Sequence, residues 1–257
     1  MLRQAQSPFE EIERRLRGRV EPDPIYKAFR EKTTKLDVLG LRLPVIQEIE
    51  QTGFSFYKNP QNKILNVWDH VWNTATTHEV MYLPLFYYRR HRTELDPPHW
   101  RVMKQWINRV ENWEHADALC QLYSIFFERY PKLVLPTLKT WNHSKNPWKR
   151  RASVVSTIYY ASPRRKAPPM KSISSLIKPL VLDTDVYVQK AVGWQLREAY
   201  KLWPREVLKF LEAYILELSA ITFSYATEKL SPKDKQRLKL KRNIYRKRKS
   251  DPHGVRS

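Results

Sequence analysis

The sequence predicts an all-α fold, a solenoid of HEAT-like helix pairs with a concave basic face. Two segments, VLPTLKTWNHSKNPWKRRASVVSTIYYASP and SLIKPLVLDTDVYVQKAVGWQLREAYKLWP, share one plan: an amphipathic stretch with a proline, a polar turn, and a second amphipathic stretch. No run alternates between apolar and polar residues for long enough to indicate a sheet. Helix pairs that recur about every 40 residues are typical of HEAT-like repeats, which stack into curved slabs.

The repeat can be followed along the chain by its prolines and tryptophans. Pro136 and Pro179 occupy equivalent places in the two segments, and Trp72, Trp113, Arg151 and Trp194 recur at intervals of about 40 residues. The second helix of each pair needs a polar residue to cap its N-terminus. We expect that cap to be Ser144 in the first segment and Asp183 or Thr184 in the second.

The two ends of the chain differ in composition from the predicted repeat region, residues 37–230. Residues 1–36 are highly charged, and we expect them to form N-terminal capping helices. Residues 231–257 form a basic tail, in which SPKDKQRLKLKRNIYRKRK holds ten Lys and Arg against one Asp. Such a run is most often solvated and partly mobile, and it can also bind nucleic acid non-specifically. Both interpretations of the tail stay open.

The charge of the chain restricts its partners. Its 257 residues carry a formal net charge of +21, with 47 Lys and Arg against 26 Asp and Glu. A field of that sign attracts polyanions, of which nucleic acid is the commonest and an anionic membrane surface the main competitor. No uninterrupted apolar stretch is long enough to span a bilayer. The N-terminal sequence is charged where a signal peptide is apolar, and Cys120 is the single cysteine, so we expect a reducing, cytoplasmic setting.

Several classes of site are excluded by what the sequence lacks. Only five glycines occur, and none lies between Gly53 and Gly193, so the centre of the chain has no phosphate-binding glycine loop. The seven histidines form no HExxH motif, and one cysteine cannot build a thiolate site, so we predict no metal and no cofactor. Gly193 lies within the helical stretch VQKAVGWQLREA, where glycine costs about 1 kcal/mol relative to alanine. We therefore expect another group to approach Gly193 closely. The first candidate is a neighbouring helix, and the second is the phosphate backbone of DNA.

Four residues are candidates for a functional site. Trp113 and Asp117 lie one helical turn apart, and Arg151 and Trp194 follow at close to the repeat spacing. Taken singly, a tryptophan is more often a core residue, and Asp or Arg is by default a solvated side chain. Their common spacing favours a second interpretation, in which all four face the concave side.

The motifs NWEHADALC, NPWKRRASVV, DVYVQKAVGWQLREAYK and LSAITFSYATEKL resemble, in this order, those of AlkD-type DNA alkylation repair enzymes, which are HEAT-like DNA glycosylases. The resemblance covers roughly Leu39 to Leu230. It implies a protein that removes purines alkylated at N3 or N7 from duplex DNA and starts base excision repair. It further implies catalytic roles for Asp117, Trp113 and Trp194, and DNA-binding roles for Arg151, Arg197, Lys190 and Arg150.

Three features depart from the family pattern. Between Trp113 and Asp117 this chain has Glu-His-Ala, and Phe223 and Tyr225 stand where related chains often carry basic residues. The long basic tail is also unusual for the family. The expected partner is alkylated double-stranded DNA, bound by a monomer without metal or membrane. The alternative is a non-catalytic HEAT-repeat protein that binds distorted or branched DNA, and a protein-binding solenoid is a third hypothesis that the charge disfavours.

Overall fold

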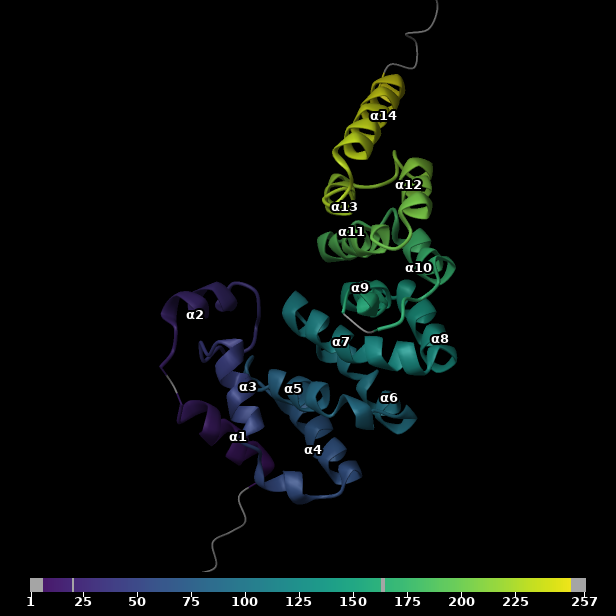
Figure 1. The fold of residues 1–257 in the computed structure, drawn as a ribbon. Coiled ribbons are helices and arrows are strands. Elements are labelled where there is room, and N and C mark those ends of the chain that lie inside the picture. Colours follow the sequence, from purple (N-terminus) through teal and green to yellow (C-terminus); the bar gives the residue numbers. More distant parts are fainter. Residues whose placement is uncertain (1–6, 20, 163–164, 251–257) are drawn as a thin grey trace, which may run out of the picture. The chain divides into compact units, whose positions relative to one another are not determined.

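The computed structural model describes residues 7–19, 21–162 and 165–250. This described part is built from 14 α-helices joined by short 3-10 helices and turns, and it contains no strand (Figure 1). The β-type pairing found in it is a single bridge between Asp37 and Thr77. The all-α prediction is therefore confirmed.

The chain divides into two compact units, with the division after Pro131. In the first unit, α3 packs against α1 and α5, α5 packs against α7, and α4 packs against α6. Alternate helices therefore form one layer and the intervening helices a second. The helices of this unit are α1 (Pro8–Arg17), α2 (Pro24–Glu31), α3 (Leu43–Gln51), α4 (Gln61–Thr74), α5 (Tyr82–Arg90), α6 (Pro97–Met103) and α7 (Trp113–Arg129).

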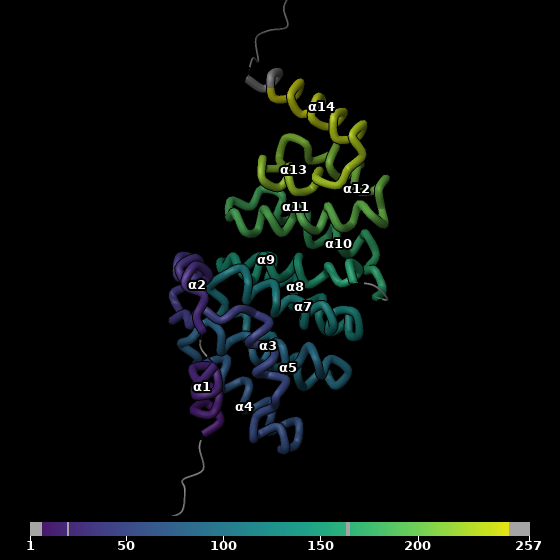
Figure 2. The backbone as a smooth tube through the Cα atoms, turned by 60° about the vertical axis from the view of Figure 1, so that its left-hand side comes forward, coloured from purple at the N-terminus to yellow at the C-terminus, as the bar shows by residue number. Residues whose placement is uncertain are grey.

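The second unit repeats the same arrangement. Helix α11 lies between α9 and α13, while α10 packs against α9 and α12 packs against α11 (Figures 1 and 2). The second helices of successive pairs are thus neighbours, as the predicted repeat requires. The helices are α8 (Pro131–Asn142), which begins at the division, α9 (Pro147–Val155), α10 (Met170–Ile177), α11 (Val186–Tyr200), α12 (Pro204–Ala213), α13 (Ala220–Ala226) and α14 (Pro232–Ser250).

Tryptophans fill the core of the first unit. The ring of Trp72 on α4 stacks on Trp106 with centroids 5.0 Å apart, and both rings are fully buried. Each indole N–H has an acceptor: Trp72 donates to the Trp106 carbonyl at 3.0 Å, and Trp106 donates to Asp69 at 2.7 Å. Because no indole proton of this pair is left unpaired, the rings contribute apolar area at no cost in buried polar groups. Trp72 is thus a core residue, the default interpretation for a tryptophan.

The expected caps of α9 and α11 are wrong by two residues or fewer. Asn146 caps α9, and Asp185 caps α11, accepting from the backbone N–H groups of Tyr187 and Val188. Ser144 and Asp183 instead accept from the backbone N–H groups of those two caps, at 3.2 and 2.9 Å. The upstream residue therefore shapes the turn, and the next side chain caps the helix.

Helices occupy much of both end regions. Helices α1 and α2 lie within residues 1–36, of which 1–6 and 20 are outside the described residues, and Ser7 forms a capping box with Glu10 at the start of α1. The predicted basic tail is a helix, α14, up to Ser250, and residues 251–257 lie outside the described residues. The predicted boundaries at 36 and 230 stay predictions.

Helix α14 is anchored on the second unit by buried side chains. Leu238 is fully buried. The Arg242 guanidinium donates to the Leu218 carbonyl at 2.5 Å and lies 4.4 Å from the centroid of the Phe223 ring. Burial, with the nearby charge of Arg246 second, lowers the pKa of Arg242 to about 10, so its side chain is still a cation at neutral pH. The first turns of the tail are therefore part of the folded unit.

Candidate functional site

The first part of the candidate site is the N-terminal end of α7. Trp113 is the first residue of this helix, and Asp117 follows one turn later. The helix begins here because the Asn112 side chain accepts hydrogen bonds from the backbone N–H groups of Glu114 and His115, at 3.1 and 3.0 Å. Trp113 and Asp117 are both half-buried, so each side chain keeps a surface that a ligand can reach.

A buried histidine holds the cap in place. His115 has no exposed surface; its Nε2 is 3.1 Å from the carbonyl oxygen of His78, and its Nδ1 is 3.1 Å from the Asn112 amide nitrogen. A carbonyl only accepts, so Nε2 carries the proton, and Nδ1 accepts from the amide. Burial holds the pKa of His115 well below its usual range, and the ring is neutral. His115 therefore fixes the start of α7, and its side chain has no exposed surface.

The residue between Trp113 and His115 is a buried carboxylate that is paired with α2. Glu114 and Arg30 are each less than one-tenth exposed and form an ion pair. Burial raises the pKa of Glu114, the Arg30 guanidinium opposes that rise, and the charge of Asp117 adds to it. Sequence reasoning missed Arg30, because it lies in the segment assigned to capping helices and its partner is far away along the chain. Glu114 and Asp117 together place two carboxyl groups on the first turns of α7.

The second part of the site is formed by α9 and α11, which pack side by side. Arg151 on α9 is only 5% exposed and donates to the Tyr187 carbonyl in the first turn of α11, at 2.6 Å. Arg150 is paired with Asp183 through two hydrogen bonds of 2.6 and 3.2 Å, and its third nitrogen donates to two carbonyls of the preceding turn. Both arginines therefore fasten α9 to the start of α11.

The other candidates of the second part lie along α11. Lys190, Trp194 and Arg197 are all half-buried. The Lys190 ammonium lies 5.6 Å from the centroid of the Tyr187 ring, and Arg197 is ion-paired with Glu228 at 2.6 Å and with Glu198 at 3.2 Å. Because these three residues recur every three or four positions, they share one face of the helix.

Gly193 of α11 owes its identity to helix packing. A Cβ atom at this position would lie 2.5 Å from the Cβ of Tyr225 and 2.8 Å from the carbonyl oxygen of Thr222, both on α13. Neither atom can move away without moving the backbone. The interpretation that a neighbouring helix requires this glycine is confirmed.

The predicted site residues thus fall into two groups, one in each unit. Trp113 and Asp117 are brought together on α7 in the first unit, and Arg150, Arg151, Lys190, Trp194 and Arg197 are gathered on α9 and α11 in the second. The convergence of the two groups on one concave face stays a prediction.

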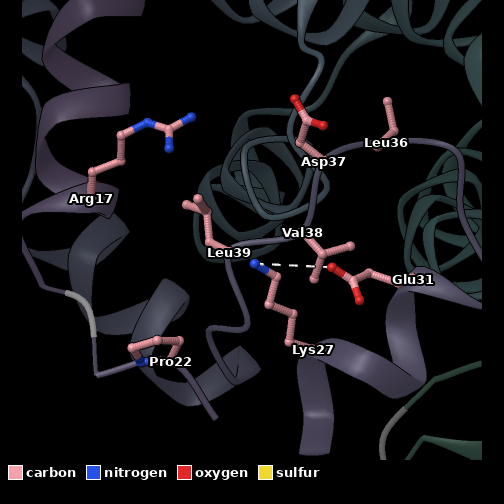
Figure 3. A pocket seen from close by; sticks show the side chains of 8 residues that line it. All are labelled: Arg17, Pro22, Lys27, Glu31, Leu36, Asp37, Val38 and Leu39. Atoms are coloured by element: carbon pink, nitrogen blue, oxygen red, sulfur yellow. Dashed lines mark ion pairs between the residues drawn. The ribbon is translucent and has the colours of Figure 1, made fainter. Parts of the chain in front are cut away.

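The first unit also has an open cavity of 640 Å³, shown in Figure 3. Its lining carries charges of both signs, and the Lys27 ammonium lies 3.9 Å from the Glu31 carboxylate. A cavity with balanced charge has no particular attraction for a polyanion such as DNA. It is lined by Arg17, Pro22, Lys27, Glu31, Leu36, Asp37, Val38 and Leu39.

Two further searches over residues 7–19, 21–162 and 165–250 gave negative results. No three side chains of His, Cys, Asp or Glu in this part of the chain are grouped so that they could hold a metal ion. None of its helices combines the length and the apolar composition that crossing a membrane requires.

Solved structures with the same fold are known. A protein from Enterococcus faecalis described as a predicted DNA alkylation repair enzyme has a TM-score of 0.71 and 17% identity, over 83% of this chain and 99% of that one. AlkD2 from Streptococcus mutans has a TM-score of 0.56 and 22% identity, over 81% and 99%. The smu.31 protein of Streptococcus mutans UA159 has a TM-score of 0.58 and 20% identity, over 88% and 100%. At these identities the likeness establishes the fold.

Sequence comparison identifies the family. No curated protein is similar enough in sequence to count as a match. The model of the DNA alkylation repair enzyme family matches residues 14–230, which include both groups of candidate residues and most of the chain. This chain therefore belongs to the DNA alkylation repair enzyme family.

Proposed function

We propose that the protein is a DNA glycosylase that removes purines alkylated at N3 or N7 from duplex DNA. The observation that carries this proposal is Asp117, a half-buried carboxylate one turn from the half-buried indole of Trp113. Both stand at a helix start that the Asn112 side chain caps and the His115 side chain supports by a hydrogen bond. Membership of a DNA alkylation repair family supplies the substrate class.

The proposed chemistry follows from the charge of the substrate. A purine alkylated at N3 or N7 is a cation, so it leaves without a strong general acid. The barrier lies in the positive charge that develops on the deoxyribose as the N-glycosidic bond breaks. Asp117 would stabilise that charge and orient the water molecule that attacks the sugar. The indoles of Trp113 and Trp194 would each add about 0.5–2 kcal/mol of attraction for a cationic base or sugar.

The remaining candidates would hold the duplex. Lys190 and Arg197 would contact phosphate groups from the face of α11 that they share, and Arg151 would do so from α9. A phosphate that binds Arg150 has to compete with Asp183, which already takes two of its hydrogen bonds. The net charge of +21 supplies the long-range attraction, and we place the protein on DNA as a monomer without metal, in the cytoplasm.

The test is release of free base from methylated duplex DNA by the native protein and by Asp117→Asn. We expect the native chain to release 3-methyladenine or 7-methylguanine. The variant removes the charge but keeps the shape, so its rate should fall by about 10²-fold or more. Its circular dichroism spectrum and its affinity for undamaged duplex should be unchanged.

Two outcomes would contradict the proposal. Equal release by a folded Asp117→Asn variant would remove Asp117 from the mechanism. No release by either protein, with tight binding to branched or distorted DNA, would favour the non-catalytic alternative.

A further inference from the structure

Helix α2 presents two large apolar side chains to solvent. Ile25 is 82% exposed and Phe29 is 53% exposed. They are four residues apart, so they lie on one face of the helix. Among the described residues of the first unit, no other large hydrophobic side chain reaches this degree of exposure. The two side chains contribute little to the core and are available for a contact with another molecule.

This face is attached to the turn that carries Trp113. Residue 30, next to Phe29, is the arginine that pairs with Glu114, and its guanidinium carbon lies 5.1 Å from the centroid of the Phe29 ring. On the other side of Trp113, Glu111 accepts hydrogen bonds from the Thr34 hydroxyl and from the backbone N–H of Lys35, the latter at 2.9 Å. The segment from α2 to residue 35 is thus bound to the residues on both sides of Trp113.

We propose that Ile25 and Phe29 form a contact surface for duplex DNA beside the candidate site. At this surface the two side chains would pack against a base or sugar that is exposed where the stacking of the DNA bases is interrupted. The inference rests on the DNA-binding part of the proposed function. Apolar side chains that fill a gap in the stack act in this way in DNA-bending proteins, and an aromatic ring can stack on any base. Phe29 and Ile25 would recognise the disturbance of the stack, and Trp113 and Asp117 would act on the lesion.

Position and area favour DNA over a protein partner. Helix α2 is tied to the residues on both sides of Trp113, which the proposed function places at the DNA. The charges around α2 do not decide the question, because Lys32 and Lys35 are exposed and so are Glu21 and Glu31. Two side chains also supply only a small part of the roughly 800 Å² per partner that a stable protein–protein interface buries. On DNA the same small area suffices, because phosphate contacts supply most of the affinity.

The test compares two duplexes of equal length and charge, one intact and one with a single tetrahydrofuran abasic site. The double variant Ile25→Ser/Phe29→Ser should bind the abasic duplex about three- to tenfold more weakly than the native protein, through lost stacking and apolar contact. Its affinity for the intact duplex should change by less than about twofold, because no charge is removed. The variant Phe29→Leu keeps an apolar side chain but loses the ring. Its affinity for the abasic duplex should lie between those of the native protein and the double variant.

Leu202→Ser is the matched control, because Leu202 is 49% exposed and lies in the second unit. It should leave both affinities unchanged. Equal affinities of the native protein and the double variant for the abasic duplex would overturn the proposal. So would a lower melting temperature of the double variant with no loss of binding, which would assign the pair to packing within the chain. Base release is not used, so a failure of the glycosylase proposal remains a separate result.

Discussion

At the scale of single residues, Gly193 gives a direct prediction. Alanine is favoured over glycine in a helix by about 1 kcal/mol. The added methyl group would, however, lie 2.5 Å from the Tyr225 Cβ and 2.8 Å from the Thr222 carbonyl oxygen. Overpacking of this kind typically costs about 1–3 kcal/mol, and here the neighbours are backbone-fixed atoms. We expect Gly193→Ala to lower the free energy of unfolding in urea by about 1–2 kcal/mol.

Ser224→Ala on α13 is the control, because Ser224 is exposed and its loss should change stability by less than about 0.5 kcal/mol. A stable Gly193→Ala variant with weakened DNA binding would show that α13 can move, and that a DNA backbone is what needs the glycine.

Sequence reasoning succeeded at Gly193 because a glycine inside a strong helix conflicts with its local surroundings. The Asp117 carboxylate could be singled out from its spacing to Trp113 and from family resemblance. Arg30 could not, since its buried partner Glu114 becomes its neighbour only after folding. The exposure of Phe29 could not be predicted either, because an aromatic side chain in an amphipathic segment is normally assigned to the core.

At the scale of elements, the start of α7 predicts how stability changes with pH. Burial lowers the pKa of His78 to about 4 and holds that of His115 well below its usual range. The unfolded chain binds protons at these rings near pH 6.5, whereas the folded chain does not. The unfolded state therefore gains protons as the pH falls below 6.5, and the folded state becomes less stable by up to about 1.4 kcal/mol per pH unit for each ring.

Urea unfolding of the native protein and of His115→Gln between pH 7 and pH 5 checks this. Glutamine does not titrate, so we expect the variant to be less stable at pH 7 but to lose less stability on acidification. Parallel losses in the two proteins would mean that His115 is not the neutral ring that its contacts indicate.

The sequence was sufficient to predict that the elements are helices, but not the residues at which they begin. The helix pairs were evident from periodicity, yet Asn146 and Asp185 cap them where Ser144 and Asp183 or Thr184 were expected. Several polar residues in one turn can each serve as a cap, and the choice depends on which side chain reaches the helix end. The many basic residues of α14 led to the prediction of a tail, although Leu238 is a buried apolar side chain that anchors the helix.

At the scale of the whole molecule, the repeat predicted the order of neighbouring helices. In each unit the second helices of successive pairs contact one another, as stacking of one repeat on the next requires. A concave basic face depends on the small rotation between repeats over the whole chain, and local periodicity does not encode that rotation. The concave basic face therefore stays a prediction.

The last prediction concerns α14 and the salt dependence of DNA binding. Each phosphate contact made by Lys or Arg releases counterions, so log affinity should fall steeply with log salt concentration, by about 0.9 per contact. Truncation after Leu230 would also remove the packing of Leu238 and Arg242, so neutralising exposed side chains is the cleaner change. In Lys233→Gln/Lys239→Gln/Arg246→Gln, the affinities for damaged and intact duplex should fall together, and the salt slope should be shallower by about one to three units. An unchanged salt slope of the variant would mean that these side chains of α14 do not contact DNA. Loss of selectivity alone would assign it a role in recognising damage.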